Sequence, residues 1–371
     1  MGLRIADLPS WRAFALTFAL LLVMGAASGV IFAAAGVYNV AASKGHWAVT
    51  RALLEFGMQR SVDTHSLLIE PPDIADPDMI ALGAGHYRGA CAPCHGGPGF
   101  AGNPIAANML PPPPRLEEDI SELKTRQIFW IVKHGLKYTG MPAWPAQNRD
   151  DEVWSLVAFL QELDGMGPDR FRLLTTGNLA RDEAAPVAAG IPSELTACMR
   201  CHESETASPV SALVPKLAGQ NREYLVTSLR AFATGERESG IMQPVAAELD
   251  QDDIERLADF YSRLQPTDGT TTAGADTSGI GKQIARNGRA EDQIPACQSC
   301  HGKDASPQFP RLAGQPERYL REQLRLWKNG LRQAGQGAIM APIANRMNNE
   351  QIAAVAQWYA SIPLEHSGVS Q

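Results

Sequence analysis

The sequence predicts an all-α protein in which one N-terminal transmembrane helix precedes three small domains in tandem. The segment from residue 13 to residue 43 contains no charged side chain and is rich in Leu, Val, Ala and Phe. A set of motifs recurs three times in the remaining chain, with a period near one hundred residues. Each repeat ends in a pattern typical of an amphipathic helix. Three compact units suit a chain of 371 residues, which is too long for one ordinary core.

The apolar N-terminal segment is long enough to span a bilayer as a helix. Arg4 and Arg12 precede it, and the small residues at 25–28 would suit a cleaved signal peptide. A signal peptide usually has a shorter apolar region, so the length favours an uncleaved anchor over residues 1–45. Under both interpretations the remainder of the chain is exported.

The six cysteines form three pairs, and none is left over. Two residues separate the members of each pair and a histidine follows directly, which is the C-x-x-C-H pattern of c-type haem attachment. The sites are Cys91, Cys94 and His95; Cys198, Cys201 and His202; and Cys297, Cys300 and His301. The cysteines of a site can add to the two vinyl groups of a haem, and the histidine can bind the iron. We therefore expect three covalently bound haem c groups.

Three further landmarks follow each site in the same order. The first is a proline, a basic residue and a leucine, at 114–116, 215–217 and 310–312. The second is a methionine in a loop marked by glycine or proline, 46, 40 and 39 residues after the histidine: Met141, Met242 and Met340. The third is a helix whose apolar positions lie 12, 15, 16 and 19 residues after that methionine. Acidic or amide residues at 150–151, 250–252 and 348–349 are expected to cap these helices.

The landmarks divide the chain into an anchor (1–45), a connecting segment (46–75) and three domains (76–166, 167–266 and 277–364). The stretch 266–275 is rich in Gly, Ala and Thr, so we expect a linker over 267–276. The start of the second domain is the least defined border, because Phe171, Leu173 and Leu174 would suit its first helix.

The sixth ligand of each iron decides whether a haem carries electrons or offers an open position to a substrate. A methionine thioether suits a carrier, because it fills this position and raises the reduction potential relative to a second histidine. A single methionine is more often core filler, but Met141, Met242 and Met340 share one register before the same helix. We therefore expect these three to be the axial partners of the attachment histidines.

Three other residues compete for the sixth position. Met109 lies 14 residues after His95, Met347 opens the last helix, and His134 lies seven residues before Met141. None of them has a counterpart in the other repeats, and we interpret His134 as a polar residue at a helix end. The other histidines, at 46, 65, 86 and 366, show no supporting pattern.

The repeated proline allows two interpretations. A carbonyl at Pro114, Pro215 or Pro310 can accept the Nδ1–H of the axial histidine and fix its tautomer. Alternatively, the proline shapes the loop that leaves the haem. The two roles are compatible, and the sequence leaves both open.

Other uses of paired cysteines explain less of the sequence. A structural zinc site needs pairs from different repeats to meet, and a thioredoxin-like motif or a disulfide explains only the cysteines. None of these accounts for the histidine after every pair or for the methionines in register. The net charge of −7 also argues against non-specific nucleic-acid binding.

Residues 76–364 resemble class I cytochromes c, in which an attachment helix, a methionine-bearing loop and a terminal helix enclose one haem. The second and third repeats, with Pro-Lys/Arg-Leu-Ala-Gly-Gln followed by Tyr224 or Tyr319, look like the two halves of periplasmic dihaem cytochromes c that carry electrons to terminal oxidases. The first repeat looks like membrane-anchored monohaem class I cytochromes. One departure is Glu203, which stands where the other repeats have glycine after the histidine.

The resemblance implies a respiratory electron carrier of the cytoplasmic membrane, single-pass, with its haem domains in the periplasm. We expect it to pass electrons from a quinol-oxidising complex toward a terminal oxidase and to have no catalytic residues of its own. An alternative is the electron-accepting cytochrome subunit of a periplasmic dehydrogenase, whose partner supplies the substrate chemistry. A third hypothesis is a haem peroxidase, which requires an iron with an accessible sixth position.

Overall fold

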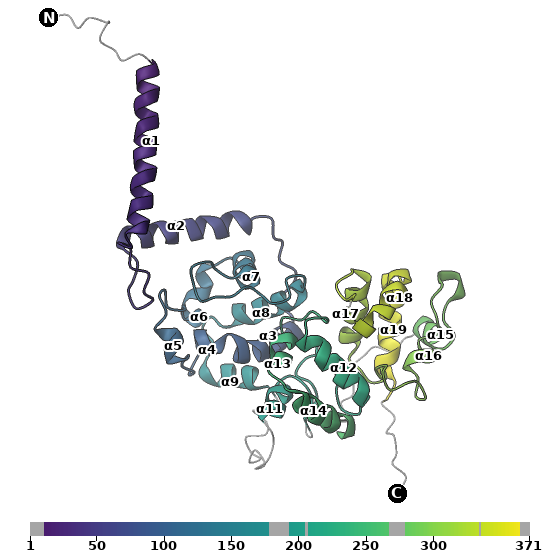
Figure 1. Ribbon diagram of the computed structural model, residues 1–371. Helices are drawn as coiled ribbons and strands as arrows, with labels where there is room; N and C mark the ends of the chain where they lie inside the picture. Colours follow the sequence, from purple (N-terminus) through teal and green to yellow (C-terminus); the bar gives the residue numbers. More distant parts are fainter. Residues whose placement is uncertain (1–10, 178–192, 205–206, 267–278, 334, 364–371) are drawn as a thin grey trace, which may run out of the picture.

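A computed structural model describes residues 11–177, 193–204, 207–266, 279–333 and 335–363. Within these ranges the chain forms helices and no β-strand, apart from two isolated β-bridges. Its buried apolar residues form three separate clusters, one for each repeat. Figure 1 shows three helical groups in chain order and one long helix that projects from the first. The predicted all-α class is confirmed.

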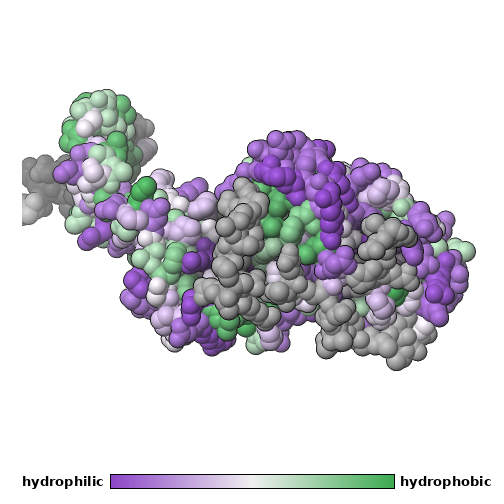
Figure 2. Space-filling model, turned by 90° about the horizontal axis from the view of Figure 1, so that it is seen from below, coloured by the Kyte–Doolittle hydropathy of each residue, from purple (hydrophilic) through white to green (hydrophobic). Residues whose placement is uncertain are grey.

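The projecting helix is α1 (Trp11–Ala34), and its side chains from residue 13 to residue 34 are exposed. The segment Ala13–Ala34 has a mean hydropathy of 2.2, and it is long enough to cross a bilayer. The helix ends before the uncharged run does, at Ala34. A second helix, α2 (Ala48–His65), lies across the end of α1 in Figure 1 and packs against α7 (Thr125–His134), a helix of the first repeat. The apolar residues of α1 stand out at one side of the molecule in Figure 2.

The first unit is built around two long helices that pack closely. Its elements are α3 (Pro77–Ala90), α4 (Ala92–His95), α5 (Pro104–Ala107), α6 (Leu116–Asp119), η2 (Ile120–Glu122), α7 (Thr125–His134) and α8 (Asp150–Glu162). Helices α3 and α8 pack against each other. Gly83 makes their approach possible, because a Cβ there would lie 2.1 Å from the Ser155 carbonyl oxygen. The rings of Tyr87 and Phe159, with centroids 5.2 Å apart, fill the core beside them.

One further helix, α9 (Pro168–Thr176), packs on this first core. Its Phe171 is fully buried, with its ring centroid 6.0 Å from that of Tyr87. The sequence instead predicts this segment at the start of the second domain. The short turn after α8 allows α9 to fold back, so that its apolar face contacts the unit that precedes it. The expected linker 267–276 and His366 lie outside the described residues.

The second and third units repeat the terminal part of this plan. The second contains α11 (Ser193–Met199), α12 (Arg222–Ala233), α13 (Met242–Ala247) and α14 (Gln251–Arg263). The third contains α15 (Ile280–Asn287), η3 (Ala290–Asp292), α16 (Gln298–His301), α17 (Glu317–Lys328), η4 (Gly335–Met340), α18 (Ala341–Arg346) and α19 (Asn349–Ser361). The predicted register of the terminal helices is confirmed, since all twelve expected apolar positions are buried: Val153, Leu156, Val157 and Leu160; Ile254, Leu257, Ala258 and Tyr261; Ile352, Val355, Ala356 and Tyr359.

The caps of the terminal helices agree with expectation in two cases of three. Asp250 and Asn348 are the N-caps of α14 and α19, and each accepts a hydrogen bond from the third residue of its helix. Helix α8 differs, because its N-cap is Arg149 and no side chain caps it. Asp150 lies inside the helix and pairs with Lys133 at 2.5 Å.

Candidate haem sites

Each C-x-x-C-H segment forms one helical turn. The backbone N–H of each histidine donates to the carbonyl of the first cysteine at 2.9 Å, in the pairs His95–Cys91, His202–Cys198 and His301–Cys297. Residues three or four apart in such a turn share one side of the helix. Both sulfur atoms and the imidazole of a site are therefore presented together, as attachment to one haem requires.

The proline carbonyls hold the imidazoles. Nδ1 lies 3.0 Å from the Pro114 oxygen in His95, 3.0 Å from the Pro215 oxygen in His202, and 2.8 Å from the Pro310 oxygen in His301. A carbonyl only accepts, so Nδ1 is the protonated nitrogen and Nε2 keeps its lone pair for a metal. Burial lowers the pKa of His202 and His301, which favours the neutral ligand form. The hydrogen bond considered in the sequence analysis is confirmed in all three repeats.

The three expected methionines occupy equivalent places in the units, and each is half-buried. Met141 follows α7 and packs against the first core, Met242 begins α13, and Met340 ends η4 and packs against the third core. The rival Met347 is 2 % exposed and belongs to the third core itself. The other rival, Met109, lies beside the Met141 loop, since a Cβ on Gly140 would be 2.8 Å from its sulfur.

His134 is the last residue of α7, as expected. Its ring centroid lies 5.1 Å from that of Trp130, and both residues line an open pocket of about 600 Å³ beside α2. Burial and the charge of Lys133 lower its pKa. The surroundings are those of a surface histidine between two helices.

Glu203 has a structural role that explains its departure from the repeat. Its carboxylate accepts hydrogen bonds from the backbone N–H groups of Leu217 at 2.6 Å and Ala218 at 3.0 Å. Burial raises its pKa. The side chain therefore ties the attachment turn to the segment that follows Pro215, a contact that glycine in the other repeats lacks.

A pair of glutamines joins the second and third units reciprocally. The amide of Gln220 accepts from the Arg311 N–H at 2.8 Å and donates to the Arg311 carbonyl at 3.0 Å. Gln315 makes the same two bonds with Lys216, at 3.0 and 2.7 Å. Each glutamine thus extends from its own Leu-Ala-Gly-Gln motif to the segment beside the other unit's proline.

Two arginines near this junction were not singled out by the sequence analysis. Arg237 donates to the Tyr319 hydroxyl at 3.3 Å and to Gln323 at 3.1 Å, and Arg332 donates to Gln323 at 2.5 Å. Neither has an ion pair among the described residues. Although burial raises the pKa of Tyr224, the charges of both arginines outweigh it and lower that pKa to about 7. Arg237 and Arg332 occupy matching positions in the second and third repeats, and this match is the sequence signal that could have identified them.

This excess of positive charge fits haem, whose propionates are carboxylates that guanidinium groups bind well. The zinc alternative has no comparable support. No group of three or more His, Cys, Asp or Glu side chains in the described part of the chain is arranged to hold a metal ion. Burial also raises the pKa of Cys91 to about 12 and that of Cys297 to about 11, so both thiols of the free chain are protonated at neutral pH.

Comparison with known proteins finds cytochromes c. The family profile described as "Cytochrome C oxidase, cbb3-type, subunit III" matches residues 78–160, and the profile "Cytochrome c" matches residues 280–362. The chain is 37 % identical over 190 residues to the "Thiosulfate dehydrogenase electron acceptor" of Thiomonas intermedia, covering 49 % of this chain and 86 % of that protein. It is 30 % identical over 191 residues to "Cytochrome c4" of Pseudomonas aeruginosa, covering 50 % of this chain and 94 % of the relative.

Among solved structures, the cytochrome c4 of Acidithiobacillus ferrooxidans is 34 % identical, with a TM-score of 0.42, and covers 46 % of this chain and 100 % of that one. The sequence relatives and the cysteine pairs together indicate covalently bound haem c. The chain therefore belongs to the class I cytochrome c family, as a member with haem-binding domains in tandem.

Proposed function

We propose that the chain binds three haem c groups, one in each repeat, and that every iron has a histidine and a methionine ligand. The ligand pairs are His95 with Met141, His202 with Met242, and His301 with Met340. The observation that carries this proposal is the common geometry of the three attachment turns. In each, a proline carbonyl leaves Nε2 of the histidine available to iron.

Bound haem supplies reversible one-electron chemistry. The residues of the chain determine how it is used. The cysteines would hold the haem covalently, the proline carbonyl orients the imidazole, and the methionine would keep water and substrates away from the iron. Arg237 and Arg332 offer cations to haem carboxylates at the junction of the second and third units. These roles are those of an electron carrier, and the relatives are electron carriers as well.

For the domains, we propose borders that follow the packing: a first unit from 76 to 176, a second from 193 to 266 and a third from 279 to 363. The first border differs from the expected 166 because Phe171 packs in the first core. We propose that residues 1–45 remain uncleaved, that α1 crosses the cytoplasmic membrane, and that the haem units lie in the periplasm. The length and apolar character of α1 support this arrangement.

In the respiratory chain, the protein would carry electrons from a quinol-oxidising complex toward a terminal oxidase. The match of the first unit to an oxidase-subunit family supports the oxidase end of this route. A second candidate is the electron-accepting subunit of a periplasmic dehydrogenase. The relative named as the electron acceptor of thiosulfate dehydrogenase favours it, because this chain covers 86 % of that protein.

The decisive experiment is mild detergent extraction of the tagged full-length protein, followed by identification of the proteins that copurify. A quinol-oxidising complex or an oxidase supports the first candidate, and a dehydrogenase supports the second. Reduction of the purified cytochrome by quinol plus complex, or by dehydrogenase plus its substrate, then distinguishes the donors. A high-spin haem with peroxide turnover would contradict both and favour the peroxidase hypothesis.

A further inference from the structure

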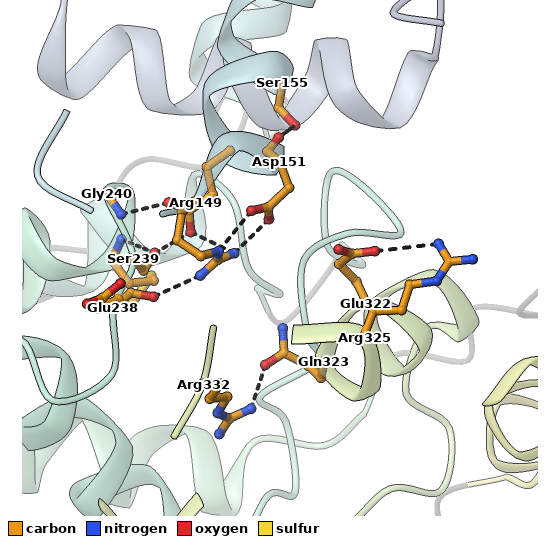
Figure 3. Close-up of polar contacts among 12 residues, drawn as sticks. Arg149, Asp151, Ser155, Glu238, Ser239, Gly240, Glu322, Gln323, Arg325 and Arg332 are labelled. Atoms are coloured by element: carbon orange, nitrogen blue, oxygen red, sulfur yellow. Dashed lines mark hydrogen bonds and ion pairs between the residues drawn. The ribbon is translucent and has the colours of Figure 1, made fainter. Parts of the chain in front are cut away.

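The segment that bears Met242 is held by the first unit. Glu152, in the first turn of α8, is 5 % exposed, and its carboxylate points out of the first unit. One oxygen accepts from the Ser239 hydroxyl at 2.6 Å, and the other accepts from the Gly240 N–H at 2.6 Å. Figure 3 shows Ser239 and Gly240 facing the end of α8. The contact joins residues 87 and 88 positions apart in the chain.

Arg149 completes this contact. Its guanidinium lies 2.9 Å from the Glu152 carboxylate, binds both oxygens of Asp151 at 2.9 and 2.8 Å, and donates to the Glu238 carbonyl at 2.8 Å. The Arg149 side chain is 11 % exposed, so both members of the pair are removed from water. A buried carboxylate is tolerated when its oxygens are hydrogen-bonded and a cation is adjacent. Here the hydrogen-bond donors come from the second unit and the cation from the first.

Apolar packing at the same place brings the two methionine segments together. A Cβ on Gly240 would lie 2.0 Å from Nε1 of Trp144, so the indole occupies the space that a side chain would need. Ile241 packs against the core of the first unit. Trp144 lies three residues after Met141, and Ile241 directly precedes Met242. The methionine segments of the first and second units are therefore in direct contact.

Ser239 connects this contact to the backbone of the proposed ligand. Its hydroxyl donates to Glu152 and accepts from the Met242 N–H at 3.0 Å. A hydroxyl can do both, since it carries one donor and two acceptor sites. Two consecutive hydrogen bonds thus link the Glu152 carboxylate to the first residue of α13.

The equivalent residues in the other two units are used differently. The position 11 residues after the methionine is Glu152, Asp253 or Gln351. Asp253 and Gln351 each close a capping box at the start of their own helix. Glu152 caps nothing in α8 and reaches the second unit instead. Its identity and orientation are explained by the contact with the next methionine segment.

We propose that Glu152 is a positioning residue for Met242, and that docking of the first unit holds the axial methionine of the second haem in place. This inference rests on the proposed His202–Met242 ligation. Arg149 orients the carboxylate through its contact at 2.9 Å, and Ser239 connects that carboxylate to the Met242 backbone by its two hydrogen bonds. The first unit therefore sets the reduction potential of the second haem, because firm methionine ligation raises that potential.

The test uses the haem-loaded full-length protein in detergent. Two readouts are followed: the near-red charge-transfer band of methionine-ligated ferric haem, and the three midpoint potentials from a spectroelectrochemical titration. Glu152→Ala removes both acceptors, Glu152→Gln keeps one, and Ser239→Ala removes only the hydroxyl. Glu162→Gln is the matched control, because Glu162 lies on the same helix in an exposed pair with Arg170.

We expect E152A to weaken the charge-transfer band of one haem and to lower one midpoint potential, while the other two stay unchanged. E152Q and S239A should give smaller shifts of the same potential, and E162Q should give none. If E152A does not accumulate with haem, S239A and E152Q provide the same readouts. The inference is overturned if all three variants retain the wild-type band and potentials.

Met242→Ala distinguishes two reasons for a negative result: a wrong positioning role for Glu152, or a wrong assignment of Met242 as the ligand. If M242A removes one methionine band and E152A does not, the ligation stands and the positioning role is wrong. If M242A itself leaves the spectrum unchanged, the ligand assignment is wrong and the positioning role is rejected with it.

Discussion

At the scale of single residues, the histidine of each attachment turn is oriented from outside the turn. A proline carbonyl 9 to 19 residues further along the chain accepts its Nδ1–H, so loop and imidazole are fixed together. The proposed methionine ligands are held in two different ways. Met141 and Met340 pack against their own cores, whereas the segment of Met242 is held by a neighbouring unit.

Substitution of one methionine tests the ligands individually. Met242→Ala should abolish one histidine–methionine signature in the ferric spectrum and lower the potential of one haem, because water or a weaker ligand would replace the thioether. The other two signatures should persist. Met109→Ala tests the corresponding assignment in the first unit, since Met109 lies beside the Met141 loop and the proposal does not use it. Loss of a methionine signature in M109A would contradict the assignment of Met141.

At the scale of helices, close packing depends on a few small residues and on glutamine side chains whose amides hydrogen-bond to backbone groups. Gly83 lets α3 approach the carbonyl of Ser155, and Gln220 and Gln315 pair with backbone across the junction of the second and third units. Both features connect elements that are distant in the sequence.

Gly83→Ala should destabilise the first unit by about 1–3 kcal/mol, because the new Cβ overlaps a backbone oxygen that cannot move without shifting α8. Gly57→Ala is the matched control in a helix interior, since a Cβ there meets nothing within 4 Å. It should stabilise by about 0.5–1 kcal/mol. Thermal unfolding of both variants, followed by circular dichroism, provides the comparison. Equal effects of the two substitutions would contradict the packing described.

Gln315→Ala should weaken the junction between the second and third units by about 1–3 kcal/mol, because it leaves the N–H and carbonyl of Lys216 without their partner. Chemical denaturation monitored at the haem absorbance measures the loss. Gln333→Ala, at an exposed position of the third unit, should have little effect.

At the scale of the whole molecule, the start of α3 is where all three units meet. Asp78 accepts the Ala212 N–H of the second unit at 2.8 Å and pairs with Arg318 of the third at 2.5 Å. Arg318 also binds Asp76, the N-cap of α3. The units are therefore held in one arrangement by charged contacts as well as by packing.

These contacts make the assembly sensitive to acid. The hydrogen bond from Arg318 lowers the pKa of Asp76. A carboxyl whose pKa is depressed on folding stabilises the folded state above its unperturbed pKa of about 3.9, and this contribution is lost as the pH falls through the lowered value. Asp76→Asn keeps the cap but removes the charge. The difference in melting temperature between wild type and D76N should be present at neutral pH and should shrink below about pH 4. A difference that does not depend on pH would contradict this account.

The features within each repeat could be predicted from the sequence, because the repetition itself reveals them. The attachment turns recur as one motif, and the buried face of each terminal helix recurs at fixed offsets from the methionine. The proline–histidine contact recurs in the same order along the chain, although its separation varies from 9 to 19 residues. The features between repeats could not. The contact between Glu152 and Ser239 has no counterpart at the matching positions of the other two repeats, where Asp253 and Gln351 cap their own helices. Helix α9 packs on the unit that precedes it because Phe171 fits the first core. Such contacts depend on how whole units dock, which no local spacing encodes.

The central claim is that every repeat carries its own haem, and the intact mass of the purified protein tests it most directly. Under denaturing conditions only covalently bound haem is retained. The account predicts a mass equal to the polypeptide plus three haems, and a loss of one haem when both cysteines of any single site are changed to alanine. A mass that corresponds to one or two haems in fully matured wild-type protein would contradict it.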